Sequence, residues 1–353
     1  MARVLVGMSG GVDSAVTAQL LKDQGYEVVG ATLRMWDPEN LNDKRWREIE
    51  DAKAVADKLM IEHHVIECAS AFSEAVIKPF VEAYVHGRTP SPCVICNRYV
   101  KWAKLIEAAD ELGAEYVATG HYARIEKTVG GRLAVKTALF KEKDQSYMLY
   151  NLMQEQLART IFPLGELSKS RVRELALEAD IEVASKADSQ EICFIPDGDY
   201  AEYVKEHAAG GVSGEGDFVD EEGHVLGKHK GIIHYTVGQR KGLGIALGHP
   251  AYVKEICVDT NEVVLSDESS LYSDEIVCKN VNFMAIDGLK DGERLKCFVK
   301  ARYRHIGQSG YLEKTGDDTV RVHFDKSVKA IAPGQAAVFY DEGGLVIGGG
   351  EIE

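Results

Sequence analysis

A short apolar run that leads into a glycine turn constrains this chain more than any other segment. Residues 4–7 have the pattern of a buried strand, Ser9-Gly10-Gly11 that of a tight turn, and Asp13-Ser14 that of a helix cap. Glycines let backbone N–H groups approach an anion closely, and a helix N-terminus directs further donors at the same point. The segment therefore predicts a phosphate-binding loop at the end of a strand, with an ordinary strand–turn–helix corner as the alternative.

This loop does not end in the Gly-Lys-Ser/Thr of the common nucleotide-binding loop, so γ-phosphate chemistry that depends on that lysine is not implied. It resembles instead the pyrophosphate-binding loop of the N-type ATP pyrophosphatases. Those enzymes split ATP into AMP and pyrophosphate and place AMP on an oxygen of the substrate. The resemblance implies ATP as cosubstrate.

The first half of the chain alternates between strand-like and helical patterns. Strand-like runs lie at residues 4–7, 28–33, 64–67 and 116–119, and helical patterns at 15–24, 45–59, 71–84 and 99–112. This alternation predicts an α/β fold with a doubly wound parallel sheet, whose ligands bind at the carboxyl ends of the strands. The glycine loop, Arg34-Met35-Trp36 and Gly120-His121-Tyr122 all follow such strand ends.

The pattern changes after residue 208. Glycine-rich turns separate short runs up to residue 248, and residues 251–258 and 262–265 form an expected hairpin. Beyond residue 273, alternating runs at 297–303, 319–324 and 336–340 predict a C-terminal antiparallel β-barrel. At 353 residues the chain is too long for one average core. We expect three domains, at 1–208, 209–272 and 273–353.

The net charge of −15 argues against nonspecific binding of nucleic acid, because phosphate contacts need positive charge. Two segments are nevertheless locally basic: residues 224–241, with Lys228, Lys230, Arg240 and Lys241, and residues 300–305. Each is either a solvated face or a local nucleic-acid surface.

Neither a secretion signal nor an apolar run long enough to span a bilayer is visible in the sequence. We therefore expect a cytoplasmic protein without membrane contact. Stable disulfides are rare in that compartment. The seven cysteines are accordingly expected to be core residues, metal ligands or redox-active thiols.

Three cysteines lie in turn-rich segments. Cys93 and Cys96 belong to Pro90-Ser-Pro-Cys-Val-Ile-Cys-Asn97, and Cys193 follows Ile192. Asn97 is a candidate helix cap, and a thiol just ahead of a helix N-terminus and near Arg98 should have a lowered pKa.

Three interpretations of these thiols remain open at this stage. A structural zinc site would need a fourth ligand that the spacing does not supply. Cys93, Cys96 and Cys193 could hold three irons of a four-iron cluster. Alternatively, one cysteine carries a persulfide and another resolves it as a disulfide. The last chemistry suits an ATP-activating loop, because sulfur can replace an oxygen that leaves as AMP.

Longer motifs extend through the whole chain, and together they resemble the bacterial tRNA-specific 2-thiouridylase family, MnmA. The motifs are Ser9-Gly-Gly-Val-Asp-Ser14, Thr89-Pro-Ser-Pro-Cys-Val-Ile-Cys-Asn97, Ala118-Thr-Gly-His-Tyr122, Lys143-Asp-Gln-Ser-Tyr147, Ile192-Cys-Phe194, Thr236-Val-Gly-Gln-Arg-Lys-Gly-Leu-Gly-Ile245, Arg302-Tyr-Arg304, Pro333-Gly-Gln335 and Gly348-Gly-Gly350.

The resemblance implies that ATP with Mg²⁺ adenylates the C2 oxygen of the wobble uridine of tRNA. Sulfur from a cysteine desulfurase or a carrier protein then replaces that oxygen, giving 2-thiouridine. Base modification requires an unstacked base, which an anticodon loop supplies cheaply. Nothing in the sequence demands more than a monomer.

The resemblance also implies site residues. Cys96 matches the nucleophile and Cys193 the persulfide carrier, and the two can form a transient disulfide. The expected ATP contacts are Gly7, Met8, Ser9, Gly10, Gly11, Val12, Asp13, Ser14, Met35 and Gly120. Ser91, Pro92 and Cys93 match the loop that meets the target base. The expected tRNA contacts are His121, Lys143, Asp144, Gln145, Arg302, Tyr303 and Gln335, together with the small central domain.

One residue departs from the family pattern. Cys93 stands where much-studied members carry an Asp with an acid–base role, so that role is not transferred to this chain. The same change completes Cys-x-x-Cys, which favours a [4Fe-4S]-dependent variant of the thiolation as one alternative. Another ATP pyrophosphatase, such as an amide-forming ligase, would have no use for Cys193. A non-catalytic RNA-binding module would not need Asp13 and both thiols.

Overall fold

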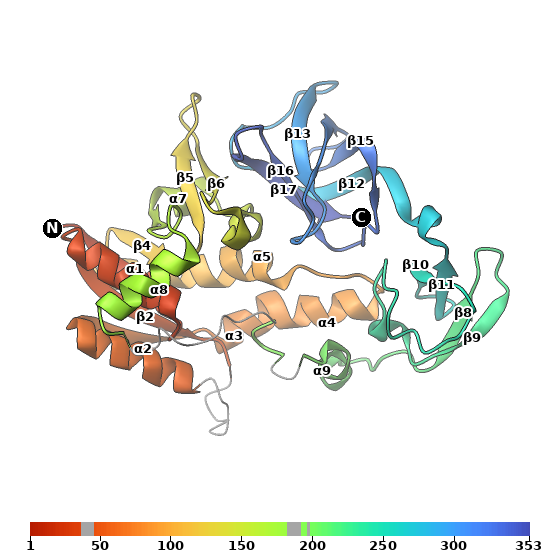
Figure 1. The fold of residues 1–353 in the computed structure, drawn as a ribbon, viewed down its shortest axis with the longest axis horizontal. Helices are drawn as coiled ribbons and strands as arrows, with labels where there is room; N and C mark the ends of the chain where they lie inside the picture. Colours follow the sequence, from red (N-terminus) through yellow and green to blue (C-terminus); the bar gives the residue numbers. More distant parts are fainter. Residues whose placement is uncertain (37–45, 182–191, 196–197) are drawn as a thin grey trace.

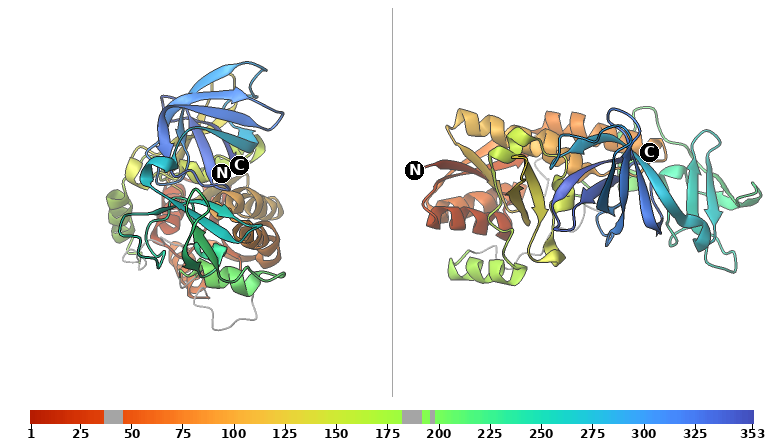
Figure 2. Two further views of the ribbon diagram at one scale, coloured as in Figure 1. Left: turned by 90° about the vertical axis from the view of Figure 1, so that its right-hand side faces the viewer. Right: turned by 90° about the horizontal axis from the view of Figure 1, so that it is seen from above.

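The computed structural model describes residues 1–36, 46–181, 192–195 and 198–353. Figure 1 shows a parallel sheet near the N-terminus, a barrel at the C-terminus and a mixed sheet at the far end of the molecule from the N-terminus. The view from above shows the same elongated arrangement (Figure 2, right).

The first sheet has five parallel strands in the order β3-β2-β1-β4-β7. They are β1 Arg3–Gly7, β2 Glu27–Arg34, β3 Glu62–Glu67, β4 Tyr116–Thr119 and β7 Thr160–Ile161. Val4, Leu5 and Val6 are fully buried in the central strand, as a continuous apolar run requires. β2, the next strand in the sequence, pairs with one edge of β1, whereas β4 pairs with the other edge of β1. The switch point of a doubly wound sheet therefore lies between β1 and β4, which confirms the predicted fold class.

Helices α1 (Val12–Asp23) and α2 (Trp46–Leu59) follow the first two strands, close to the predicted ranges. Met60 ends α2 with φ of 53°, a left-handed conformation that a Gly would adopt more readily. A helical stretch follows β3, made of α3 (Ala69–Phe72), the π-helical η1 (Ser73–Ile77) and α4 (Lys78–Val85).

A second helical stretch carries the paired cysteines and differs from the prediction. It comprises α5 (Pro92–Cys96), the π-helical η2 (Asn97–Trp102) and α6 (Ala103–Glu111), so it begins at Pro92 and not near Tyr99. Pro fits the first helical position because its missing N–H has no partner to lose there. The prediction of Asn97 as a helix cap is wrong. Asn97 is buried inside the helix and donates from Nδ2 to the Met148 carbonyl at 2.9 Å.

Further short elements lie on both sides of residue 208. They include the hairpin β5 (Ala123–Lys127) and β6 (Leu133–Thr137), which the sequence analysis did not anticipate. The helices are α7 (Gln154–Ala158), α8 (Lys169–Glu178) and α9 (Tyr200–His207). Short 3-10 turns are η3 (Lys141–Lys143), η4 (Ser146–Leu149), η6 (Ile232–His234) and η7 (Glu268–Leu271). Among the described residues, no helix is long and apolar enough to cross a bilayer.

The second half of the chain is built from two sheets. The mixed sheet has the order β10-β11-β8-β9, with β8 Gly216–Val219, β9 Val225–His229, β10 Tyr252–Cys257 and β11 Glu262–Ser266. β10 and β11 form the predicted hairpin. The barrel closes in the order β12-β15-β14-β13-β16-β17. Its strands are β12 Tyr272–Phe283, β13 Arg294–Lys300, β14 Gln308–Lys314, β15 Val320–Lys329, β16 Ala336–Tyr340 and β17 Val346–Ile352. The predicted C-terminal barrel is therefore confirmed.

Candidate active site

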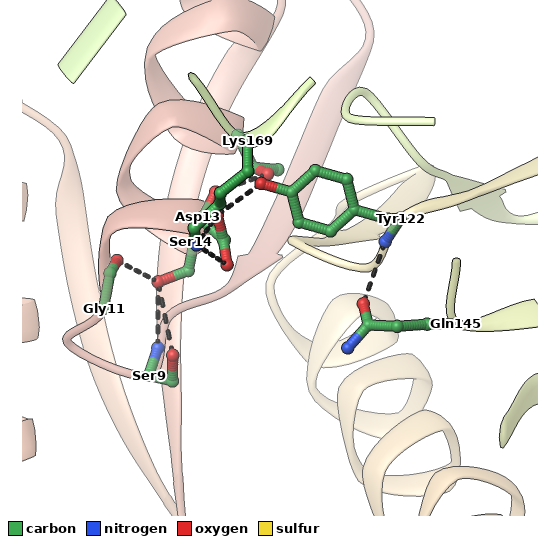
Figure 3. A network of polar contacts seen from close by, with 8 residues as sticks. Ser9, Gly11, Asp13, Ser14, Tyr122, Gln145 and Lys169 are labelled. Carbon is green, nitrogen blue, oxygen red and sulfur yellow. Dashed lines mark hydrogen bonds and ion pairs between the residues drawn. The ribbon is translucent and has the colours of Figure 1, made fainter. Parts of the chain in front are cut away.

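The glycine loop joins β1 to α1 at the switch point of the sheet. The Ser9 backbone N–H donates to Ser14 Oγ at 3.2 Å, and Ser14 Oγ donates to the Gly11 carbonyl at 3.0 Å (Figure 3). Gly10 has φ of 70°, and a Cβ there would lie 2.4 Å from the Glu48 carbonyl oxygen. No side chain caps α1 at Gly11, and the first N–H groups of a helix have no intrahelical acceptor. These donors fit the phosphates of ATP.

The other two predicted nucleotide contacts also lie at the carboxyl edge of the sheet. Gly120 follows β4 and packs directly on the start of α1, since a Cβ there would lie 2.9 Å from Asp13 C and Ser14 N. Met35 follows β2 and packs against the apolar cluster that contains Cys96. The structure thus places Gly120 beside the loop, and Met35 at the end of β2 against the cluster that contains Cys96.

Asp13 has two partners that sequence reasoning missed. Lys169 Nζ lies 2.8 Å from both carboxylate oxygens of Asp13, and Tyr122 Oη donates to Asp13 Oδ1 at 2.7 Å (Figure 3). The only local signal for Lys169 was the preceding Ser168, which caps α8 by accepting from the Arg171 N–H at 3.2 Å. That signal locates a helix start but says nothing about which carboxylate the lysine meets.

The two predicted reactive thiols lie on the same side of the molecule. Cys96 is 7% exposed and belongs to an apolar cluster with Phe72, Val100 and Phe194. The Phe194 ring packs against those of Phe72 and Phe80 at centroid distances of 5.5 and 5.1 Å. Cys193, which precedes Phe194 in the sequence, is exposed. The charge of the Cys193 thiolate contributes to the raised pKa of Cys96. Phe194 therefore anchors the Cys193 segment beside Cys96.

The expected lowering of the thiol pKa values is wrong. Burial raises the pKa of Cys96 to about 12, and Lys101 opposes this only in part. Cys96 lies inside the helical stretch, where the apolar cluster desolvates its thiolate. Desolvation also raises the pKa of Cys93, although solvent reaches this side chain. Burial therefore disfavours the thiolate form of both side chains in this state.

The segment predicted to meet the target base is attached to the barrel. Ser91 Oγ accepts a hydrogen bond from the Ala336 N–H at 3.1 Å. Gln335 Nε2 donates to the carbonyls of Thr89 and Pro90 at 3.0 and 3.2 Å. Pro92 and Cys93 then begin α5. The side-chain amide of Gln335, a predicted tRNA contact, thus attaches the loop 89–92 to the barrel.

The structure brings several other predicted tRNA contacts together. Tyr303 Oη donates to the Asp144 carbonyl at 3.2 Å. Desolvation raises the pKa of Tyr303, with smaller contributions from the Asp144 carboxylate and from Cys93, so these groups are neighbours. The Asp144 carboxylate accepts from the Ala138 N–H and from Ser146 Oγ, each at 2.8 Å, and so stabilises its own turn.

Three more of these residues have partners inside the protein. Gln145 Oε1 accepts from the Tyr122 N–H at 2.9 Å (Figure 3), and Lys143 precedes this pair at the end of η3. Arg302 donates to the carbonyls of Lys329 and Ala330 at 3.0 and 3.1 Å. Burial lowers the pKa of His121 well below its usual range, and Nδ1 lies 2.8 Å from Thr119 Oγ1. Burial therefore favours the neutral form of His121.

The two basic segments are partly neutralised. Lys228 forms an ion pair with Asp217 across β8 and β9 at 2.7 Å. The Arg240 guanidinium lies 6.0 Å from the centre of the Tyr252 ring. Burial lowers the pKa of Lys300. Among these cations, the charge of Lys228 is therefore balanced by a neighbouring carboxylate.

All seven cysteines lie among the residues that the structure describes. None of the cysteines belongs to a group of three ligand atoms within 4.8 Å of one another, and none is joined in a disulfide. The thiols as placed therefore do not form a site for a single metal ion. Asp220, Glu222 and His224 do gather, on a solvent-exposed turn.

Comparison with known families divides the chain into three matches. Residues 2–197 match the family model described as tRNA methyl transferase HUP domain. Residues 201–267 match the tRNA methyl transferase PRC-barrel domain, and residues 273–352 the aminomethyltransferase beta-barrel domain. Among solved structures, the U34-tRNA thiolase NcsA of Methanococcus maripaludis is 17% identical with a TM-score of 0.36, covering 59% of this chain and 67% of that one.

Named relatives match over their full length. The chain is 45% identical over 359 residues to the tRNA-specific 2-thiouridylase MnmA of Lachnoclostridium phytofermentans, covering 100% of this chain and 99% of the relative. It is 48% identical over 356 residues to the tRNA-specific 2-thiouridylase MnmA 1 of Clostridium tetani, covering 99% and 96%. The glycine loop, the paired thiols and these end-to-end matches lead to one conclusion: the chain belongs to the tRNA-specific 2-thiouridylase family.

Proposed function

We propose that this protein converts the wobble uridine of tRNA to 2-thiouridine in an ATP-dependent reaction. The observation that carries the proposal is the shared environment of the two thiols. Cys96 and Phe194 belong to one apolar cluster, and Met35 at the carboxyl end of β2 packs against it. Met35, a proposed nucleotide contact, thus packs against the same cluster as Cys96, which supports a common site. The names of the full-length relatives support uridine in tRNA as the substrate.

In the first step, the C2 oxygen of uridine attacks the α-phosphorus of ATP. The bond from that phosphorus to the pyrophosphate oxygen breaks, and the N3 proton of the base goes to solvent. The turn from Gly10 to Ser14 and the N-terminal end of α1 hold the phosphates, with Gly7, Met8, Ser9, Met35 and Gly120 beside the nucleotide; the Met8 N–H itself donates to the Ala31 carbonyl at 2.7 Å. A bound Mg²⁺ would neutralise phosphate charge, and Asp13 is the carboxylate placed to hold it.

Sulfur transfer follows on Cys193. The terminal sulfur of a Cys193 persulfide attacks C2, and the bond from C2 to the AMP oxygen breaks. Cys96 then loses its thiol proton to solvent, and the thiolate attacks Cys193 Sγ, whose bond to the transferred sulfur breaks. The electron pair stays on the sulfur at C2, N3 regains a proton, and a Cys96–Cys193 disulfide remains. A thiol reductant restores both cysteines, and a cysteine desulfurase or carrier protein supplies the next persulfide sulfur.

The tRNA would be held across three domains, with boundaries that we propose near residues 208 and 272. Ser91, Pro92 and Cys93 meet the base, and the barrel supports them through Gln335. His121, the Lys143–Gln145 segment, Arg302 and Tyr303 surround the anticodon. The exposed ring of Tyr303 is 39% accessible and can stack on an unpaired base. We propose a cytoplasmic monomer that needs no membrane.

A [4Fe-4S]-dependent variant is the second candidate, because Cys93 completes a Cys-x-x-Cys and Cys193 lies near Cys96. Iron content and visible absorbance of protein purified without oxygen test it. If the protein holds stoichiometric iron and loses thiolation when the iron is removed, the cluster-dependent route replaces the persulfide route. Iron-free protein that thiolates tRNA would exclude the cluster.

The experiment that tests the proposal measures three quantities in each cysteine variant: AMP release, 2-thiouridine formation and tRNA affinity. Cys96→Ser and Cys193→Ser should each abolish thiolation. Their tRNA affinity should stay within about 1 kcal/mol of wild type, because neither thiol contacts phosphate. Cys257→Ser, at a half-buried thiol in the mixed sheet, is the matched control and should remain active. Thiolation by either active-site variant contradicts the assigned roles.

The same assay separates this function from a ligase of the same superfamily. AMP release should require tRNA, and Asp13→Ala should lose it without losing tRNA affinity. AMP release that persists without tRNA, in the presence of a small acceptor, would indicate the ligase.

A further inference from the structure

The loop proposed to meet the target base is joined to the barrel by a guanidinium as well as by the Gln335 amide. Arg88 Nη2 donates to Glu351 Oε1 at 2.7 Å and to the Ile352 carbonyl at 2.8 Å. Both acceptors lie at the end of β17, the last strand of the barrel. The Arg88 side chain is 28% exposed, and the steps proposed above make no use of it.

The bonds of Arg88 belong to a closed ring of contacts. The Gly334 N–H donates to the Ile352 carbonyl, and the Ile352 N–H donates to the Gln335 carbonyl, each at 2.8 Å. The end of β17 thus fixes the turn that carries Gln335. The Gln335 side chain in turn holds the loop at the two residues that follow Arg88. Arg88 therefore fixes the support to which its own loop is attached.

Neighbouring contacts hold the same loop on two further sides. Gly87 has φ of 66° and packs on the mixed sheet, since a Cβ there would lie 2.9 Å from Ile256 Cγ2. The Thr89 N–H donates to the Pro333 carbonyl at 2.8 Å. The loop thus lies where the first half of the chain, the mixed sheet and the barrel meet, and it leads directly into α5 with the paired thiols.

Docking of the barrel on the first half of the chain has other contacts besides those of Arg88. One apolar cluster contains both Trp102 of η2 and Val338 of β16. Arg132, just before β6, pairs with Asp287 at 2.7 Å and donates to two backbone carbonyls at the end of β12, at 3.0 and 3.1 Å. Its side chain is also 28% exposed. The two arginines thus make comparable contacts with the barrel, but only Arg88 belongs to the loop that leads to the thiols.

Placement of this loop matters for the proposed reaction. A misplacement of about 1 Å can cost about 100-fold in rate when two bound groups must react. The loop continues into α5, which ends at Cys96, so a shift of the loop moves the thiols relative to the barrel. A change at Arg88 would therefore alter the distance between the thiols and a base that the barrel helps to hold.

We propose that Arg88 is a positioning residue for thiolation. By fixing the end of β17, it holds the target-base loop, and with it the thiols of α5, at the distance from the barrel that the reaction requires. The inference rests on the proposed function for its reaction. It gives the last strand of the barrel a part in placing the reacting groups that does not depend on contact with RNA.

Single-turnover thiolation of tRNA tests the inference in Arg88→Met, with Arg132→Met as the matched control. Arg88→Met should lower the maximal rate of 2-thiouridine formation roughly 10- to 100-fold. Its ATP affinity and its half-saturating tRNA concentration should stay close to those of wild type, because a positioning residue acts on the reacting geometry and not on ground-state binding. The variant leaves Glu351 with a cation, since Lys279 Nζ lies 3.9 Å from the same carboxylate oxygen.

Two further variants complete the comparison. Arg132→Met should thiolate as wild type does, although it loses an equivalent set of contacts with the barrel. Arg88→Lys should recover part of the lost rate, because an ammonium can still donate to one of the two acceptors. If Arg88→Met does not fold, the intermediate loss expected in Arg88→Lys decides the question.

Hydrogen–deuterium exchange of the free protein gives a second readout that needs no activity. The Thr89 amide should exchange faster in Arg88→Met, because the loop opens more often, and at the wild-type rate in Arg132→Met. A wild-type thiolation rate in Arg88→Met, an equal loss in Arg132→Met, a loss confined to ATP or tRNA affinity, or unchanged exchange at Thr89 would overturn the inference. If wild-type protein does not thiolate tRNA, the proposed function fails, and exchange at Thr89 then decides whether Arg88 fixes the loop.

Discussion

The raised pKa of Cys96 leads to a direct prediction about its reactivity in the free enzyme. With a pKa of about 12, roughly one thiol in 10⁵ is ionised at pH 7, against about 3% for an unperturbed cysteine. Because the thiolate is the reacting form, Cys96 should react with iodoacetamide at least about 10³-fold more slowly than a free thiol. Its rate should rise about tenfold per pH unit between pH 7 and 10, since ionisation is far from complete in that range.

Mass spectrometry of the cysteine peptides as a function of time gives this rate. Cys93→Ser protein avoids a second label on the same peptide, and the exposed Cys193 is an internal comparison that should be modified first. A Cys96 rate that reaches a plateau near pH 9 would refute the burial argument. The pKa of Cys96 is higher in the folded protein than in the unfolded chain, so burial of the neutral Cys96 thiol stabilises the fold below about pH 9. That contribution is lost as the pH rises toward 12.

Three further changes have defined outcomes. Gly120→Ala should lower the free energy of unfolding by about 1–3 kcal/mol and weaken ATP binding, because its Cβ would lie 2.9 Å from the backbone of α1. Gly130→Ala, with its nearest contact at 3.8 Å, is the control in thermal melting and calorimetry. Gln335→Ala removes both hydrogen bonds to the loop 89–92. This variant should thiolate tRNA more slowly and bind ATP as wild type does. A reduced ATP affinity would contradict this expectation. Trp102→Phe removes the 2.6 Å hydrogen bond to Thr160 Oγ1 and should cost about 2 kcal/mol in urea unfolding; a cost near zero would refute that contribution.

Local patterns were sufficient to predict the order of strands and helices from β1 to β4, but not the hairpin β5–β6 that follows. The buried run at Val4–Val6 and the glycine turn after it specify a strand, a loop and a helix through contacts within a few residues. The alternating runs after residue 273 likewise indicated a barrel, because side chains on successive positions of a strand face opposite sides. The start of α5 was missed because Ser91 and Pro92 were read as loop, although Pro suits the first position of a helix.

Only the tertiary structure decided the chemistry of individual groups. The spacing of Cys93 and Cys96 suggested activated thiols, whereas Phe72 and Phe194 from separate segments desolvate Cys96 and raise its pKa. Lys169 meets Asp13 from another helix, a pairing that no local pattern encodes. Burial and charge depend on whichever atoms the fold brings within a few ångströms. A sequence motif can therefore name the reactive residues, but their ionisation and partners follow from packing between distant segments.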